Sequence, residues 1–314
     1  MHMADALVSP AVGGTMWVAT AAATVYCAKK VRKEADQGRI PLMGVLGAFV
    51  FAAQMVNFTI PGTGASGHIT GGLILAILLG PEAAFLVMAS VLAVQALFLA
   101  DGGLLALGCN VFNLGVLPAF VAYPLVYRLI FGRGVVGRTP APGRAGAAAV
   151  IGGVVALQLG AFAVVLETTL SGVSALPFAA FAGVMLPIHL AIGLVEGAAT
   201  AAIVGFVATS QPDILGEQAG AGRRRPTWRM IAALALVALL LGGGLAWFSS
   251  TDPDGLEWAV TRVGSTLKPQ VSQPDGASLE GAGTSVEGLV GSAVTVAAAI
   301  AAGVLLRRRK AHTP

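Results

Sequence analysis

Four histidines occur in the 314-residue chain, and the one in second place offers the most specific chemistry. His2 can present a metal ion with its backbone amide and its imidazole, while the free amine of Met1 supplies a third nitrogen. These groups close a five-membered and a six-membered chelate ring, so the three nitrogens lie in one plane with a fourth corner open. Planar nitrogen coordination suits Ni(II) and Cu(II) better than Co(II). Because the amine and the amide must lose protons, metal affinity should fall as the pH falls.

His68 is the candidate for the fourth corner. It stands in the stretch FTIPGTGASGHITGG, residues 58–72, whose glycines allow a loop to fold inward against the rest of the chain. We expect Asn57, Thr63 and Ser66 to supply hydrogen bonds that orient the imidazoles. The alternative is that His2 is an ordinary terminal residue and that His68 is a loop residue or helix cap.

Four further polar residues lie inside apolar segments, where polar groups are costly and call for a functional hypothesis. His189 and Glu196 are seven residues apart and share one helix face. They are candidates for an ion path, although a hydrogen-bonded structural pair is the favoured interpretation. Hydrogen bonds between helices are the simplest explanation of Asn110 and Asn113.

The composition places these residues in a lipid bilayer. Hydrophobic residues make up 56% of the chain and charged residues only 11%, against about a quarter charged in an ordinary soluble domain. A soluble chain of this length would need a polar coat, and too few polar residues are present to make one. The net charge of +4 does not indicate nucleic-acid binding, because the basic residues gather beside apolar segments without interleaved aromatics.

A transmembrane helix needs about twenty apolar residues, and nine segments approach or meet this length. The sequence therefore predicts an all-α polytopic membrane protein with a seven-helix body and a two-helix appendix. Pro81 separates the third segment from the fourth, because proline starts a helix well and cannot donate a backbone hydrogen bond. The predicted segments are residues 8–28, 40–58, 69–80, 83–100, 105–127, 145–168, 178–209, 229–248 and 287–306.

The basic residues predict the orientation of these helices. With the N-terminus outside the cell and the C-terminus in the cytoplasm, every one of the 19 basic residues except Arg262 and Lys268 lies on the inner side. This is the bias expected of short cytoplasmic loops. The two exceptions lie in one long external loop, where the bias is weak. We therefore expect a multi-pass protein of the cell membrane.

Composition also divides the chain into parts. Residues 1–209 form the predicted metal-binding body, and residues 210–228, which carry Pro, Gly and successive arginines, are interpreted as a cytoplasmic linker. Residues 229–314 form the appendix, whose two helices bracket an external stretch at 249–286. That stretch has few apolar side chains, so we expect a flexible loop without a core of its own.

Several other chemistries find no support in the sequence. Cys27 and Cys109 are the only cysteines and lie in different apolar segments, which favours two buried thiols over a disulfide or a thiolate metal cluster. No basic residue precedes the first apolar stretch, so we expect an uncleaved chain that begins at Met1. No nucleophile elbow or phosphate-binding glycine loop occurs. Any ATP hydrolysis linked to this protein must therefore take place on another chain.

Five stretches carry a resemblance to known families. They are MHMADALVSP (1–10), AFVFAAQMVNFTIPGTGASGHITGG (48–72), CNVFNLGVLPAF (109–120), LPIHLAIGLVEGAATAA (186–202) and DPDGLEWAV (252–260). The first four resemble the CbiM/NikM family, the substrate-specific membrane subunits of energy-coupling-factor cobalt and nickel transporters. The last resembles the PDGLE domain, which is related to the CbiN/NikN component. The usual acidic-glycine-phenylalanine run after His2 is replaced here by Ala4-Asp5-Ala6-Leu7.

The resemblance implies a ligand set, a substrate and partners. The metal is held by four nitrogens, from the Met1 amine, the His2 amide and imidazole, and the His68 imidazole. The implied transported substrate is Ni(II) or Co(II), with nickel slightly favoured by the planar nitrogens and the PDGLE segment. The implied partners are a transmembrane coupling subunit (CbiQ- or NikQ-like) and ATPase subunits (CbiO- or NikO-like). The chain itself is then a transporter subunit and not an enzyme.

Two other functions stay open at this point. A secondary transporter working alone would use Glu196 as its ion-coupling site, and metal uptake without an ATPase partner would favour it. A membrane-embedded enzyme would use His189 and Glu196 with a bound metal. It would need a further ligand at the same depth, whereas Glu82 and Glu167 lie nearer the helix ends.

Overall fold

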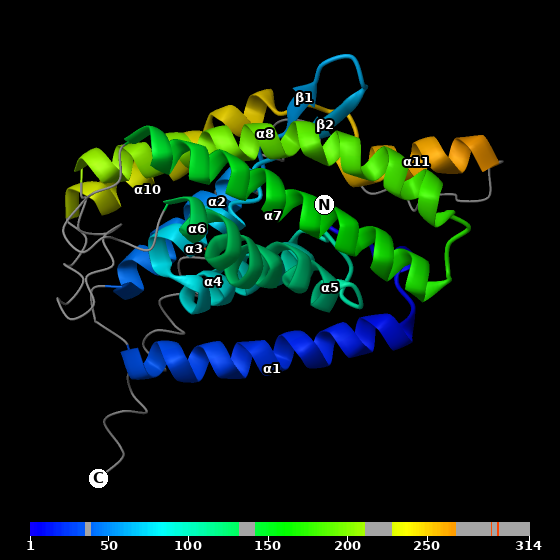
Figure 1. Ribbon diagram of the computed structural model, residues 1–314, viewed down its shortest axis with the longest axis horizontal. Helices are drawn as coiled ribbons and strands as arrows, with labels where there is room; N and C mark the ends of the chain where they lie inside the picture. The colour runs from blue at the N-terminus through cyan, green and yellow to red at the C-terminus, as the bar shows by residue number, and fades with distance from the viewer. Residues whose placement is uncertain (35–38, 132–141, 211–227, 268–289, 291–293, 295–314) are drawn as a thin grey trace, which may run out of the picture.

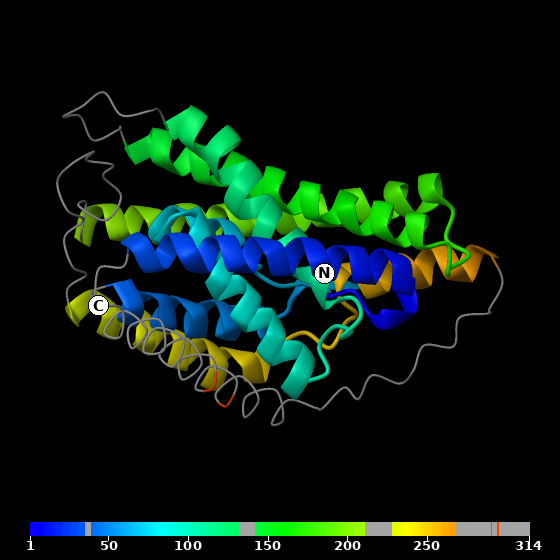
Figure 2. The same ribbon diagram turned by 90° about the horizontal axis from the view of Figure 1, so that it is seen from below.

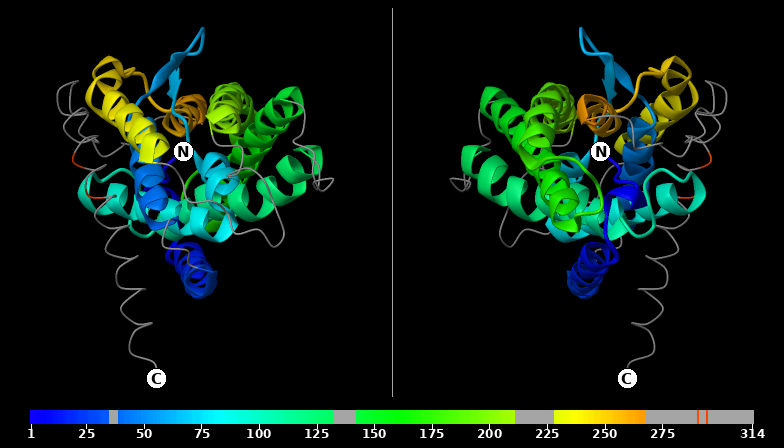
Figure 3. Two further views of the ribbon diagram at one scale, coloured as in Figure 1. Left: turned by 90° about the vertical axis from the view of Figure 1, so that its left-hand side faces the viewer. Right: turned by 90° about the vertical axis from the view of Figure 1, so that its right-hand side faces the viewer.

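The computed structural model of this chain describes residues 1–34, 39–131, 142–210, 228–267, 290 and 294. The long helices run along one axis (Figure 1). α7 (Pro142–Ser171) packs beside α8 (Phe178–Ser210), and α2 (Arg39–Gln54) packs beside α10 (Trp228–Gly243) on the other side of the bundle (Figure 2). The amino terminus lies between these two pairs of helices in the end-on views (Figure 3). The start of the chain is thus placed within the bundle.

Six helical stretches of the described residues are long and apolar enough to cross a membrane. They confirm a mostly helical membrane protein, while the orientation and the count of nine helices stay predictions. The ninth predicted segment, 287–306, lies outside the described residues apart from residues 290 and 294. The six stretches are Pro10–Lys33, Pro81–Phe98, Leu107–Phe131, Gly143–Ser171, Phe178–Ser210 and Trp228–Phe248.

The predicted break between the third and fourth segments is confirmed. α3 (Gly72–Leu79) ends before Gly80, and α4 (Pro81–Phe98) begins with its proline. Gly80 has a φ of 82°, a left-handed value that residues with side chains rarely adopt. All eight residues of α3 are buried, so this short helix fills the interior of the bundle.

The remaining helical elements include one long helix, α1, and several short or irregular ones. α1 (Pro10–Glu34) follows a single turn of 3-10 helix, η1 (Asp5–Leu7). The other helical elements are α5 (Leu107–Val111), the π-helical η2 (Phe112–Tyr127), α6 (Arg128–Phe131), and the 3-10 helix η3 (Leu245–Phe248) after α10. η2 contains two prolines, which remove backbone donors and crowd the preceding turn of an α-helix. Its wider turns let the span continue past both of them.

A hairpin connects α2 to α3. β1 (Phe58–Ile60) and β2 (Ala65–Gly67) pair antiparallel and project from the helices (Figure 1). Gly62 in the turn has a φ of 76°, which glycine adopts without strain. The glycine-rich loop expected from the sequence is therefore a short hairpin, followed by residues 68–71 that return to the bundle.

The prediction of a flexible external loop at 249–286 is wrong for its first part. Residues Gly255–Leu267 form α11, which lies against α8. Its buried face carries Leu256, Ala259 and Val263. A short helix needs only one apolar stripe to pack. The low apolar content of the whole stretch therefore concealed α11. Residues 268–286 lie outside the described residues.

We expect the contact between α7 and α8 to require glycine at position 197. A methyl group there would lie 2.6 Å from the Val150 carbonyl oxygen and 2.7 Å from its Cα, and this backbone has no room to move. Gly197→Ala should lower the free energy of unfolding by about 1–3 kcal/mol and reduce the thermal midpoint in detergent. Gly205→Ala is the matched control on the same helix, because nothing lies within 4 Å of its added methyl. Equal midpoints for the two variants would contradict this packing.

Candidate metal site at the amino terminus

The first three residues lie inside the bundle, where Met1 and Met3 are almost fully buried. The side-chain amide of Asn110 holds them there. Its Oδ1 accepts the backbone N–H of Met3 at 2.8 Å, and its Nδ2 donates to the Met3 carbonyl at 3.2 Å. The backbone N–H of Gly103 donates to the same carbonyl. Asn110 therefore pairs with the terminal backbone, and not with another helix as the sequence led us to expect.

The positive amino group of Met1 faces the carboxylate of a residue that is distant in the sequence. The Met1 nitrogen donates to Oδ2 of Asp254 at 2.9 Å. Oδ1 of the same carboxylate accepts the backbone N–H of Glu257, in the first turn of α11, at 2.8 Å. Burial alone would raise the pKa of Asp254, but the Met1 ammonium overrides it and holds the pKa well below its usual range. Asp254 is thus a charged partner of the terminal amine.

The imidazoles of His2 and His68 stack, with ring centroids 5.4 Å apart and an angle of 7° between their planes. Nδ1 of His2 lies 3.2 Å from Oδ1 of Asp101. Nε2 of His2 and Nδ1 of His68 are buried and have no hydrogen-bond partner among the described residues. Burial, the Met1 ammonium and His2 lower the pKa of His68 to about 3. His68 is therefore neutral, the form in which histidine binds metals.

Glu196 of α8 fixes the segment that carries His68. One carboxylate oxygen accepts the backbone N–H of Thr70, and the other accepts that of Gly71 at 3.0 Å. Nε2 of Gln54 donates to the Thr70 carbonyl at 2.8 Å. Non-helical backbone within a membrane bundle needs such partners, because no water is present to replace them. Glu196 therefore bonds to the loop and not to His189, so the pair expected from their shared helix face is not formed.

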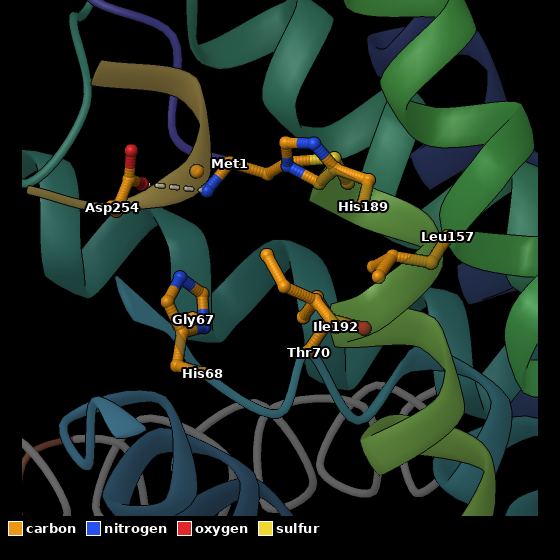
Figure 4. A pocket seen from close by; sticks show the side chains of 9 residues that line it. Met1, Gly67, His68, Thr70, Leu157, His189, Ile192 and Asp254 are labelled. Carbon is orange, nitrogen blue, oxygen red and sulfur yellow. Dashed lines mark hydrogen bonds and ion pairs between the residues drawn. The ribbon is translucent and has the colours of Figure 1, made fainter. Parts of the chain in front are cut away.

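His189 makes its own backbone contact and faces a cavity. Its Nδ1 lies 2.8 Å from the carbonyl oxygen of Met185. A carbonyl only accepts, so we assign the ring proton to Nδ1 and a lone pair to Nε2. The ring lines a small cavity together with Met1, His68 and Asp254, and Figure 4 shows these side chains directed into one space. His189 is thus placed beside the terminal amine.

The three residues expected to orient the imidazoles make their hydrogen bonds elsewhere. Oγ1 of Thr63 donates to the Ile60 carbonyl within the hairpin turn. The backbone of Asn57 and both backbone and side chain of Ser66 bond to residues 249–253, which precede α11. These residues attach the C-terminal segment to the hairpin, and the expectation about their partners is wrong.

The other polar residues of the spans fit their expected roles. Nδ2 of Asn113 donates to Oε2 of Glu167 on α7 at 2.7 Å, a hydrogen bond between helices. Cys27 and Cys109 are free and buried, as predicted.

The part of the chain that the structure describes holds no group of three or more His, Cys, Asp or Glu side chains able to bind a metal ion. A metal ion at the amino terminus would therefore need the terminal amine or backbone nitrogen as well as imidazoles.

Two carboxylates at the site were missed by reasoning from the sequence. Asp254 is 253 positions from Met1, and no local pattern connects the two. Asp101 follows α4 and precedes a Gly-Gly pair, which is a turn signal. Its place in an external turn, on the same side as Met1 in the predicted orientation, was the only available sign of a contact with His2.

Comparisons with known proteins match both parts of the chain. The family described as "Cobalt uptake substrate-specific transmembrane region" (CbiM) matches residues 2–214, and the PDGLE domain matches residues 228–281. A protein of Archaeoglobus fulgidus named "Putative fused nickel transport protein NikMN" is 34% identical over 305 residues, which cover 95% of this chain and 96% of that protein. The "Cobalt transport protein CbiM" of Geobacter sulfurreducens is 31% identical over 84% of this chain and 77% of its own length.

A solved structure also matches. The crystal structure described as a truncated transition metal transporter has a TM-score of 0.58 and 30% sequence identity, and the match covers 67% of this chain and 99% of that one. Sequence and structure thus point to the same class of protein.

We expect Glu196→Gln to loosen the loop that carries His68. Glutamine keeps one acceptor oxygen but turns an NH₂ group toward a backbone N–H, which leaves a buried donor without a partner. The cost should be about 1–3 kcal/mol in the free energy of unfolding, measured by thermal unfolding in detergent. Glu257→Gln is the control, since that side chain is exposed. A Glu196→Gln protein as stable as this control would show that the two hydrogen bonds contribute little.

Proposed function

Because this chain belongs to the CbiM family of cobalt-uptake substrate-specific transmembrane proteins, we propose that it is the substrate-capturing membrane subunit of an ATP-driven importer of Ni(II) or Co(II). The subunit takes the ion at an external site at its amino terminus and passes it inward. The observation that carries the proposal is the meeting of the buried Met1 amine, His2 and His68 at one place.

The proposed ligands are four nitrogens: the Met1 amine, the His2 amide, Nδ1 of His2, and a nitrogen of His68. The neutral state and unpaired nitrogen of His68 support its role as the fourth ligand. Nδ1 of His2 faces Asp101 in the structure. Metal binding therefore requires this nitrogen to leave the carboxylate and turn toward the ion. Once the ion is bound, the nearby carboxylate of Asp101 offsets part of its positive charge.

The energy for import comes from other chains in this proposal. The sequence holds no phosphate-binding loop, so ATPase subunits and a transmembrane coupling subunit complete the importer. Residues 1–209 form the capture body, 210–228 a cytoplasmic linker and 229–314 the PDGLE part, with Met1 on the outer face of the membrane. Nickel is the slightly favoured substrate, because planar nitrogen coordination suits Ni(II) better than Co(II).

One observation weighs against a secondary transporter that works through Glu196. Both oxygens of this carboxylate already accept backbone hydrogen bonds from the loop beside His68. An ion that displaced these hydrogen bonds would leave two buried N–H groups unpaired, at a cost of about 1–3 kcal/mol each. A function that needs these oxygens for an ion or a proton must therefore compete with the loop for them. The capture subunit is the function that uses the groups left available.

The ligand set makes a direct prediction for metal binding. His2→Ala and His68→Ala should each abolish Ni(II) binding to the purified full-length protein. Each variant removes one imidazole nitrogen from the proposed ligand set. Isothermal calorimetry and metal content by mass spectrometry measure the loss.

His312→Ala is the control for these variants, because it removes a histidine that is not among the proposed ligands. It should bind Ni(II) like the wild type. Wild-type affinity in both site variants would refute the proposed site.

The pH dependence of binding gives a second test. The Met1 amine and the His2 amide must both lose protons before they bind the ion, so Ni(II) affinity should fall as the pH is lowered. A plot of the logarithm of the binding constant against pH should rise with a slope between about one and two protons per ion. A flat plot between pH 6 and 8 would mean that neither group is a ligand.

A further inference from the structure

We propose that Asp254, from the PDGLE part of the chain, is a positioning residue for the proposed metal site. Its carboxylate holds the Met1 amine in place both before and after the metal ion binds. The inference deepens the proposed function and rests on it. It assigns a residue of the PDGLE part to a site built from the first 68 residues. It gives the PDGLE part a direct role in metal capture.

The chemistry of the amine allows one contact to serve both states. A terminal ammonium has three N–H groups, one of which donates to Oδ2 of Asp254 at 2.9 Å. Metal binding removes one proton and uses the freed lone pair, so two N–H groups remain. One of these can keep the hydrogen bond to the carboxylate while the nitrogen binds the ion. Carboxylates hold metal-binding histidines in the same manner, through the N–H that the metal does not use.

The structure fixes Asp254 firmly enough for this role. Its Oδ1 accepts the backbone N–H of Glu257 and its carbonyl accepts that of Trp258, so the residue caps the N-terminus of α11. The preceding turn is attached to β2, because the backbone N–H of Ser66 donates to the Pro253 carbonyl at 2.8 Å. Ser66 is two residues from His68 in the sequence. The carboxylate and the fourth ligand are thus held on one framework.

Gly255 closes the same wall of the cavity. A methyl group at this position would lie 3.0 Å from Cδ1 of Ile192 and 3.3 Å from Nε2 of His189. The backbone therefore approaches α8 so closely that an added methyl group would press on both side chains. Asp254 and Gly255 line the same cavity as Met1 and His189, so this segment forms one side of the proposed site.

The decisive variant is Asp254→Asn, tested in the full-length protein. Asparagine caps a helix N-terminus as well as aspartate does, so the start of α11 should be kept. What is lost is the negative charge facing the amine. Asp252→Asn is the matched control, because this substitution removes the same charge two residues away. The Asp252 carboxylate accepts from the Ser250 hydroxyl at 3.2 Å and does not contact the amine.

Ni(II) affinity is measured by competition with a chromogenic chelator, using nickel alone as the probe. Asp254→Asn should weaken binding about 10- to 100-fold, the usual effect of losing the partner of a metal ligand. Asp252→Asn should stay within about twofold of the wild type, and Asp254→Glu should recover part of the loss. At saturating nickel, the absorption spectrum of the Asp254→Asn protein should match the wild type, because the four nitrogens are unchanged. A merely structural defect would alter the spectrum or the thermal midpoint of the metal-free protein.

Two results would overturn the inference while leaving the proposed function intact. One is wild-type affinity in Asp254→Asn when His2→Ala has lost binding. The other is an equal loss in Asp254→Asn and Asp252→Asn, which would assign the effect to general charge. If His2→Ala itself binds nickel like the wild type, the proposed function fails, and the role of Asp254 fails with it.

Discussion

The charged amino group of Met1, buried in an apolar bundle, is the constraint on which the rest of the site depends. A lone ammonium in such surroundings is costly, and a structure that contains one must provide an opposite charge. Asp254 provides it at 2.9 Å. This pair joins the first residue to a segment that begins after the last long described helix. The two ends of the described chain therefore cannot be understood separately.

Two polar side chains within the bundle serve as partners for irregular backbone. Asn110 pairs with Met3 as a neighbouring strand would, and Glu196 accepts two N–H groups of the loop after His68. Each would be an expensive residue if it faced lipid. Here they make it possible for two non-helical segments, the terminus and the loop, to enter a space where only helices are otherwise stable. The stacked imidazoles of His2 and His68 are the result.

Local patterns were enough to predict most of the helices and to single out His2 and His68, whose rings lie stacked in the structure. Hydropathy located the long spans, and Pro81 separated α3 from α4. The chelate expected from the order Met1-His2 stays a prediction. The contacts of Asp254 and Asp101 could not be found this way, because they depend on how distant segments pack. α11 was missed for a related reason: its single apolar stripe is meaningful only beside α8.

The attachment of Asp254 to the same polypeptide as Met1 has a consequence for assembly. A tether gives a group a local concentration at its target on the order of millimolar, whatever the abundance of the protein in the membrane. Each chain therefore contains one carboxylate for its one amine, and the two groups meet without the binding of a second protein. A homologue that carried this segment on a separate subunit would need an intermolecular interface to reach the same occupancy. Covalent fusion replaces that interface with a length of chain.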